Sequence, residues 1–132
     1  MAASDDVSVG VPDIDGEHTL QIQLLRSVER AVKDGATGRA LLALGHLEDF
    51  TNAHFLSEQL LMRLHAYPGF EAHVAEHDRL IGELGEMRRA LETGTAAPAA
   101  TLAAEVERWL LVHIRTADRA LGSFLAAGPA SA

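Results

Sequence analysis

The chain has 132 residues, 48% of them hydrophobic, which suits a globular domain able to bury its own core. It contains no cysteine, so disulfides, thiolate catalysis, zinc–cysteine sites and iron–sulfur clusters are excluded. Its formal net charge of −8 argues against nucleic acid or an anionic membrane surface as a partner, because both are bound through basic patches.

Four segments repeat apolar residues at steps of three and four, the spacing of one helix face. They cover about 16–34, 38–65, 70–92 and 99–126. The residues expected in the core include Leu25, Val28, Leu44, Leu47, Leu80, Leu84, Val106 and Leu110. Glycine and proline mark the short gaps between the segments, which favours antiparallel neighbours. The sequence therefore predicts an all-α fold, an antiparallel up-down-up-down four-helix bundle, as one domain over 1–132.

Side chains of the kinds that bind metals lie on the apolar stripe of each predicted helix. They are His18 in the first helix, His54 and Glu58 in the second, His73 and His77 in the third, and His113 and Asp118 in the fourth. Burying an unpaired, ionised carboxylate in a bundle core costs several kcal/mol, and a bound cation can offset this cost. We therefore interpret this set as metal ligands and not as ordinary core histidines.

The spacing of these residues indicates a dinuclear site. His73 and His77 are four residues apart and share one helix face, so both can reach one ion. His54 and Glu58 have the same spacing, and a carboxylate can bridge two metals. Asp118 is less clear, because a separation of five places it about 140° around an ideal helix from His113. On geometry alone, Asp118 is either a ligand or a solvated or capping residue.

Four segments of the chain resemble the bacterial members of the hemerythrin family. They read VGVPDIDGEH, HFLSEQLLM, YPGFEAHVAEH and WLLVHIRTAD, and the similarity extends from about Val9 to Phe124. The family pattern is H, then HxxxE, HxxxH and HxxxxD, and this chain has every member in order. The five-residue spacing is the family's own, so the resemblance identifies Asp118 as a ligand.

The resemblance implies a centre of two non-haem irons joined by an oxo or hydroxo bridge. One iron would be bound by His73, His77 and His113, and the other by His18 and His54. Glu58 and Asp118 would bridge them. The second iron, with two imidazoles, would keep a position open for dioxygen.

The residues around that position are the expected oxygen pocket. Four apolar candidates for its wall are Phe55, Trp109, Leu110 and Ile114, and plain core packing is the other interpretation of each. The family usually has an apolar residue three positions after the first histidine, where this chain has Gln21. The Gln21 amide could bind a ligand or admit water. Alternatively, it could rotate outward and leave Ile22 to fill the space.

Two functions fit this site. The first is reversible dioxygen binding for storage, delivery or sensing, and the alternative is a di-iron enzyme acting on dioxygen, peroxide or nitric oxide. Gln21 is the one feature that favours the alternative. A ferritin-like carboxylate site requires Glu-x-x-His pairs, and a zinc hydrolase usually has H-E-x-x-H; neither occurs.

Three smaller expectations complete the sequence-based picture. The two remaining histidines, His46 and His65, lie too far along the second helix to share its metal and are expected at the surface. The exposed faces look polar enough for a monomer. The absence of cysteine and of any apolar run long enough to span a membrane agrees with a cytoplasmic protein.

Overall fold

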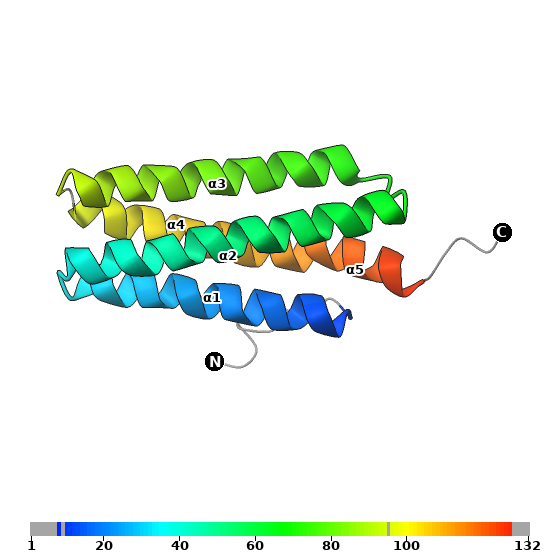
Figure 1. The fold of residues 1–132 in the computed structure, drawn as a ribbon, viewed down its shortest axis with the longest axis horizontal. Helices are drawn as coiled ribbons and strands as arrows, with labels where there is room; N and C mark the ends of the chain where they lie inside the picture. Colours follow the sequence, from blue (N-terminus) through cyan, green and yellow to red (C-terminus); the bar gives the residue numbers. More distant parts are fainter. Residues whose placement is uncertain (1–7, 9, 95, 128–132) are drawn as a thin grey trace.

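Three long helices and a fourth, composite one form an antiparallel four-helix bundle in the computed structural model, which describes residues 8, 10–94 and 96–127 (Figure 1). The first three helices are α1 (Pro12–Lys33), α2 (Thr37–Leu64) and α3 (Phe70–Glu92). The fourth rod consists of α4 (Ala96–His113), the short π-helix η2 (Ile114–Asp118) and α5 (Arg119–Ala126). The all-α bundle predicted from the sequence is confirmed.

The observed helix boundaries agree closely with the predicted ones, except at two N-termini. α1 begins at Pro12 and not near residue 16, because proline at the first helical position needs no hydrogen-bond partner and has a helical φ already. α4 begins at Ala96 and not near residue 99, so Pro98 lies in its first turn. The first N–H groups of a helix have no partner within it, so proline is tolerated there.

Short connections determine the antiparallel arrangement. Gly35 follows α1 with a φ of 70°, a left-handed conformation that glycine adopts without strain. Its N–H donates to the carbonyl of Val32 at 3.1 Å, which ends the helix within one turn. The main contacts run between α1 and α2, α2 and α3, α3 and α4, and α4 and α1, so the four rods close a ring around one core.

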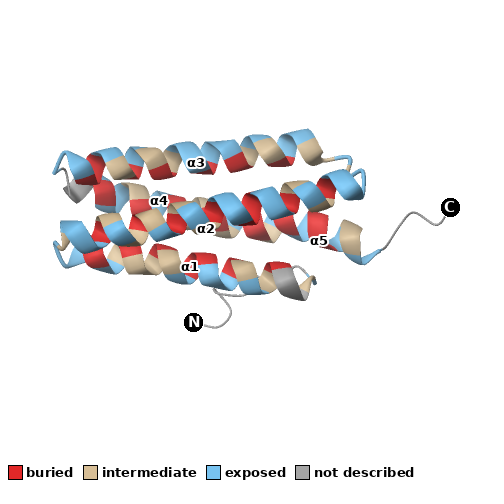
Figure 2. Ribbon diagram, in the orientation of Figure 1, coloured by how far each residue is buried: buried red, intermediate tan, exposed pale blue. Residues whose placement is uncertain are grey.

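The core follows the predicted apolar stripes, whose buried residues face the bundle axis (Figure 2). The eight core residues named above are each 2% exposed or less, whereas Leu61, Leu102 and Trp109 on the same predicted stripes are only partly buried. The eight lie mainly in the half of the bundle where α1 ends and α2 begins. The other half, where α2 ends and α3 begins, is filled largely by histidines and carboxylates. The bundle is therefore divided along its length into an apolar half and a polar half.

The outer face of α2 differs from the expected polar surface. Leu42, Leu56, Leu60 and Leu64 are between 56% and 70% exposed. Three of these leucines follow one another at steps of four and form a stripe along the helix. None of the helices in the described part of the chain combines the length and apolar character needed to cross a membrane.

Two glutamates face each other where α1 packs against α4. Glu29 of α1 interacts with Glu107 of α4, and Arg26 lies 3.8 Å from the same Glu107 carboxylate. Burial raises the pKa of Glu29 to about 7, helped by a hydrogen bond to Glu107 and by its charge. The native chain thus holds a proton on Glu29 that the unfolded chain releases near pH 4.5.

Replacing Glu29 should therefore stabilise the protein at high pH. The contribution of Glu29 falls as the pH rises from about 4.5 to 7, and above pH 7 both carboxylates are ionised in the native state. We expect Glu29→Gln to raise the free energy of unfolding at pH 8 by about 0.5 to 1 kcal/mol, because solvent screens much of the repulsion between the two carboxylates. At pH 4.5 we expect no such increase. Urea unfolding at both pH values measures this. Glu105→Gln, an exposed position on α4, is the control. An equal effect at both pH values would contradict the prediction.

Candidate metal centre

All seven residues predicted as metal ligands lie in the polar half of the bundle. The half is built from the first turns of α1 and α3, the second half of α2 and the junction of α4 with η2 (Figure 1). Each of the seven is at most 3% exposed: His18, His54, Glu58, His73, His77, His113 and Asp118. The antiparallel topology thus brings residues 100 positions apart, such as His18 and Asp118, into one buried cluster.

The ligand atoms form two overlapping groups. One contains Glu58, His73, His77, His113 and Asp118, and the other contains His18, His54, Glu58 and Asp118. Within each group the candidate ligand atoms all lie within 4.8 Å of one another. Both groups include the same two carboxylates, which is the arrangement a bridged metal pair requires.

The two oxygens of Glu58 face different groups. Its Oε2 lies 3.3 Å from His18 Nε2 and 3.1 Å from His54 Nε2. Its Oε1 lies 3.1 Å from His73 Nε2 and 3.0 Å from His77 Nε2. The carboxylate therefore stands between the two sets of imidazoles, one oxygen toward each.

Asp118 is divided in the same way. Its Oδ2 lies 2.9 Å from His18 Nε2, while its Oδ1 lies 2.8 Å from His73 Nε2 and 3.1 Å from His113 Nε2. Each carboxylate thus contacts imidazoles of both groups, Glu58 from α2 and Asp118 from η2.

The π-helix η2 explains how Asp118 reaches this position. The N–H of Arg119 donates to the carbonyl of Ile114, a bond spanning five residues instead of four. One additional residue in the turn moves Asp118 back over His113, although an ideal α-helix would place it about 140° away. The ambiguity left by ideal geometry is resolved by this local departure from it.

Two glutamates that the sequence analysis did not consider support the imidazoles. The Nδ1–H of His54 donates to Glu17 Oε1 at 2.5 Å, and that of His113 donates to Glu76 Oε1 at 2.5 Å. Such a bond fixes the tautomer, leaves Nε2 free toward the cluster and makes it a stronger electron donor. Each glutamate directly precedes a clustered histidine, Glu17 before His18 and Glu76 before His77. This repeated Glu-His pair is the sequence signal that could have identified the two supporting glutamates.

Aromatic rings stack on two of the imidazoles, His77 and His113. Phe55 stacks on His77 with centroids 3.6 Å apart and an interplanar angle of 2°. Trp109 stacks on His113 at 4.9 Å and 8°. Both rings thus pack against the group that has three imidazoles. Leu110 and Ile114, the other two expected wall residues, are 2% and 0% exposed on the same rod.

Gln21 points into the bundle, so the outward rotation considered from the sequence is wrong. Its side chain is 1% exposed, and its Nε2 donates to Thr51 Oγ1 at 3.0 Å. Ile22 is also buried, at 5% exposed. The two neighbours therefore share the interior instead of replacing one another.

Hydrogen bonds among the clustered groups dominate their ionisation. Burial alone would lower the pKa of His18 and His73, but hydrogen bonds to Asp118 and Glu58 raise each to about 9. Burial would raise the pKa of Asp118 and Glu58, yet hydrogen bonds from the histidines hold both below their usual values. Burial prevails at His77 and lowers its pKa. Both carboxylates are accordingly anionic at neutral pH.

Several buried nitrogen and oxygen atoms of the cluster lie close to a neighbouring ligand residue but make no well-aligned hydrogen bond. They include the Nε2 atoms of His54, His77 and His113 and the Oδ1 atom of Asp118. Unpaired lone pairs on buried nitrogen and oxygen are costly, and coordination to a cation removes the cost. Imidazole and carboxylate together suit first-row transition metals, so the residues present fit an iron pair.

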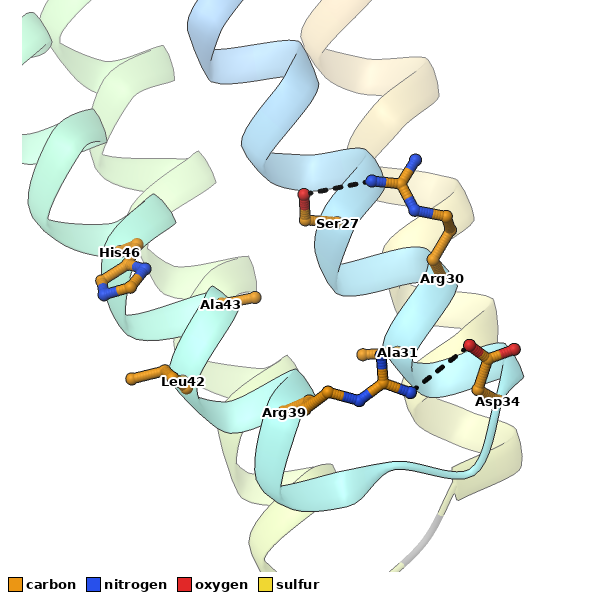
Figure 3. Close-up of a pocket in the computed structure, with 8 residues that line it drawn as sticks. All are labelled: Ser27, Arg30, Ala31, Asp34, Arg39, Leu42, Ala43 and His46. Atoms are coloured by element: carbon orange, nitrogen blue, oxygen red, sulfur yellow. Dashed lines mark hydrogen bonds and ion pairs between the residues drawn. The ribbon is translucent and has the colours of Figure 1, made fainter.

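The two remaining histidines lie outside the cluster, as expected. Both His46 and His65 are exposed. His46 lines an open hollow of about 350 Å³ between α1 and α2, together with Arg30 and Arg39 (Figure 3). Arg39 there pairs with Asp34 at 3.4 Å. This hollow lies toward the apolar half of the bundle, away from the candidate centre.

Comparison with known proteins identifies a family and several relatives. A family model described as the hemerythrin HHE cation binding domain matches residues 9–125. A bacteriohemerythrin of Methylococcus capsulatus is 29% identical over 96% of this chain and 95% of its own length. One of Stenotrophomonas maltophilia is 29% identical over 88% and 75%, and hemerythrin subunit 1 of Golfingia vulgaris is 35% identical over 57% and 55%. No solved structure gives a significant match.

The metal-free protein should lose stability as the pH rises. His18 and His73 keep their protons up to about pH 9 when folded, against about 6.5 for an ordinary histidine, so their contribution is complete below pH 6.5 and disappears toward pH 9. We expect the Tm of the metal-free protein to fall by about 5 °C over this range. Calorimetry measures it, with zinc-loaded protein as the control, because metal then replaces the protons. A level or rising Tm in the metal-free protein would contradict the prediction.

Removing the charge of either supporting glutamate should weaken metal binding. Glu17→Gln and Glu76→Gln each replace an anionic acceptor by a neutral amide, which makes the paired imidazole a poorer donor. We expect each to lower the affinity for Zn²⁺ about 10- to 100-fold, measured by competition with a chelator. The control is Glu71→Gln, an exposed glutamate at the start of α3. Affinities equal to that of the control would show that the two glutamates play no supporting part.

Proposed function

Because the chain belongs to the hemerythrin HHE cation binding domain family, we propose that it binds dioxygen reversibly at a centre of two non-haem irons. The role would be storage, delivery or sensing of dioxygen. The observation that carries the proposal is the sharing of Glu58 and Asp118 between two groups of imidazoles. The relatives named bacteriohemerythrin, one of which is matched over nearly its whole length, support it.

Each residue of the cluster has a proposed part. His73, His77 and His113 hold one iron, and His18 and His54 hold the other. Glu58 and Asp118 would bridge the pair, together with an oxo or hydroxo group from solvent. When bound, the iron pair supplies the reversible transfer of electrons that amino-acid side chains lack.

The two groups are unequal, and this inequality supports one of the two metal positions as the site of the external ligand. One group offers five residues and the other four. With both carboxylates shared, the metal held by His18 and His54 would have one protein ligand fewer, which would leave room for an external ligand. The structure thus supports dioxygen binding on the side of α1 and α2.

Apolar side chains suit this centre to binding without further reaction. Phe55, Leu110 and Ile114 are each at most 2% exposed, and they limit the access of water to the cluster. Glu17 and Glu76, two carboxylates at the edge of the cluster, are already paired with His54 and His113. A di-iron enzyme acting on dioxygen, peroxide or nitric oxide is the second candidate, favoured by the buried amide of Gln21.

The visible spectrum of the iron-loaded protein tests the function. We expect two irons per chain and, after air is admitted to the reduced protein, a ligand-to-iron charge-transfer band that disappears when oxygen is purged. Glu58→Ala, which removes a shared carboxylate, should not form the band. Immediate and irreversible oxidation of the wild-type protein would reject the carrier and make turnover of peroxide and nitric oxide the next assays.

The monomeric state and cytoplasmic location expected from the sequence stay predictions. The exposed leucines on α2 argue against the monomeric state, because an apolar stripe on a helix can pack against a second chain. Light scattering on the purified protein would measure its mass in solution.

A further inference from the structure

A buried polar pair, Gln21 and Thr51, lies one helix turn from His18 and His54. Gln21 follows His18 by three residues on α1, and Thr51 precedes His54 by three on α2. Because the two helices are antiparallel, both pairs lie on the same interface, about 4.5 Å apart along the helix axis. The His18 and His54 rings meet with centroids 4.8 Å apart, and Gln21 Nε2 meets Thr51 Oγ1 at 3.0 Å.

The pair does not satisfy its own hydrogen-bonding capacity. Gln21 is 1% exposed and Thr51 0%, and Gln21 Oε1 has no partner in the protein. A primary amide has two donors and an acceptor with two lone pairs, of which this contact uses one donor. Leaving a buried carbonyl unpaired is destabilising, which makes the amide a poor choice for simple packing.

On the side away from the two histidines, the buried neighbours of the pair along the two helices are apolar. Ile22 and Leu25 on α1 and Leu47 on α2 are each at most 5% exposed. A leucine at position 21 would match these neighbours without any unmet hydrogen bond. The amide is therefore better explained by a partner that it binds than by the packing of this interface.

We propose that Gln21 and Thr51 form a binding site for a small molecule that hydrogen-bonds to them at the open metal position. In the absence of another ligand, the occupant is water. Rotation of the amide about its last bond exchanges its oxygen and nitrogen, so the site can accept from water or donate to an anion. This inference rests on the proposed function, because it concerns the metal position beside His18 and His54.

The consequence is a preference among external ligands. Dioxygen is neutral and a weak acceptor, whereas azide is a charged acceptor that gains a hydrogen bond from the amide. A hydrogen bond to a charged group contributes about 1.5 to 3 kcal/mol, equivalent to roughly a tenfold or greater change in affinity. This chain should accordingly bind small anions more tightly than a variant with an apolar residue at position 21.

Azide titration of the oxidised, iron-loaded protein tests the proposal. Gln21→Leu keeps a similar volume without the amide, and Thr51→Val removes only the hydroxyl. We expect the azide Kd, followed by visible absorption, to rise about tenfold in Gln21→Leu and several-fold in Thr51→Val. The control is Ile22→Leu, a volume-conserving change at the adjacent buried position. An azide Kd in Gln21→Leu equal to that of the control overturns the proposal.

A crystal structure of the wild-type, iron-loaded protein with azide decides the matter if Gln21→Leu fails to hold two irons. Azide or a water within about 3.2 Å of the Gln21 amide supports the proposal, and purely apolar surroundings there overturn it. Neither measurement depends on reversible dioxygen binding. Reversible dioxygen binding can therefore fail in the spectral test while azide still binds through Gln21. Conversely, reversible dioxygen binding can hold while the azide Kd does not depend on Gln21.

Discussion

Two buried carboxylates surrounded by five imidazoles are the constraint on which the rest of this structure depends. Glu58 and Asp118 are each about 1% to 2% exposed, and their charges need compensation from every direction. All four rods contribute a histidine to that compensation. The bundle topology, the position of the helix ends and the local π-helix all serve to bring these groups to one place. The apolar half of the core stabilises the helices that hold this polar half together.

Much of this arrangement could be predicted from the sequence because it follows from regular spacing. Steps of three and four placed Leu25, Leu44 and Leu84 in the core, and all three are buried. A spacing of four placed His73 and His77 on one face, and their rings are in contact. Short connections between long helices require neighbouring helices to be antiparallel, and this arrangement brings the predicted metal ligands together.

The features that helix periodicity alone could not predict depend on departures from regularity or on contacts between helices. Asp118 could not be placed by ideal helix geometry, because the wider turn of η2 is a local adjustment that periodicity does not encode. Glu17 pairs with a histidine of the next helix, and such a contact requires the relative rotation of two helices to be known. The orientation of Gln21 similarly depended on finding Thr51 opposite it.

The two supporting glutamates have one further implication. Glu17 is 37 residues before His54, and Glu76 is 37 residues before His113. The α1–α2 hairpin and the α3–α4 hairpin therefore repeat one internal design, each contributing the imidazoles of one group and one shared carboxylate. Neither hairpin completes a group alone, because each group includes the carboxylate of the other half. Any metal held there joins the two halves, and both metal positions would be lost together if the hairpins separated. The rate at which the hairpins part would then set an upper limit on the lifetime of the whole centre.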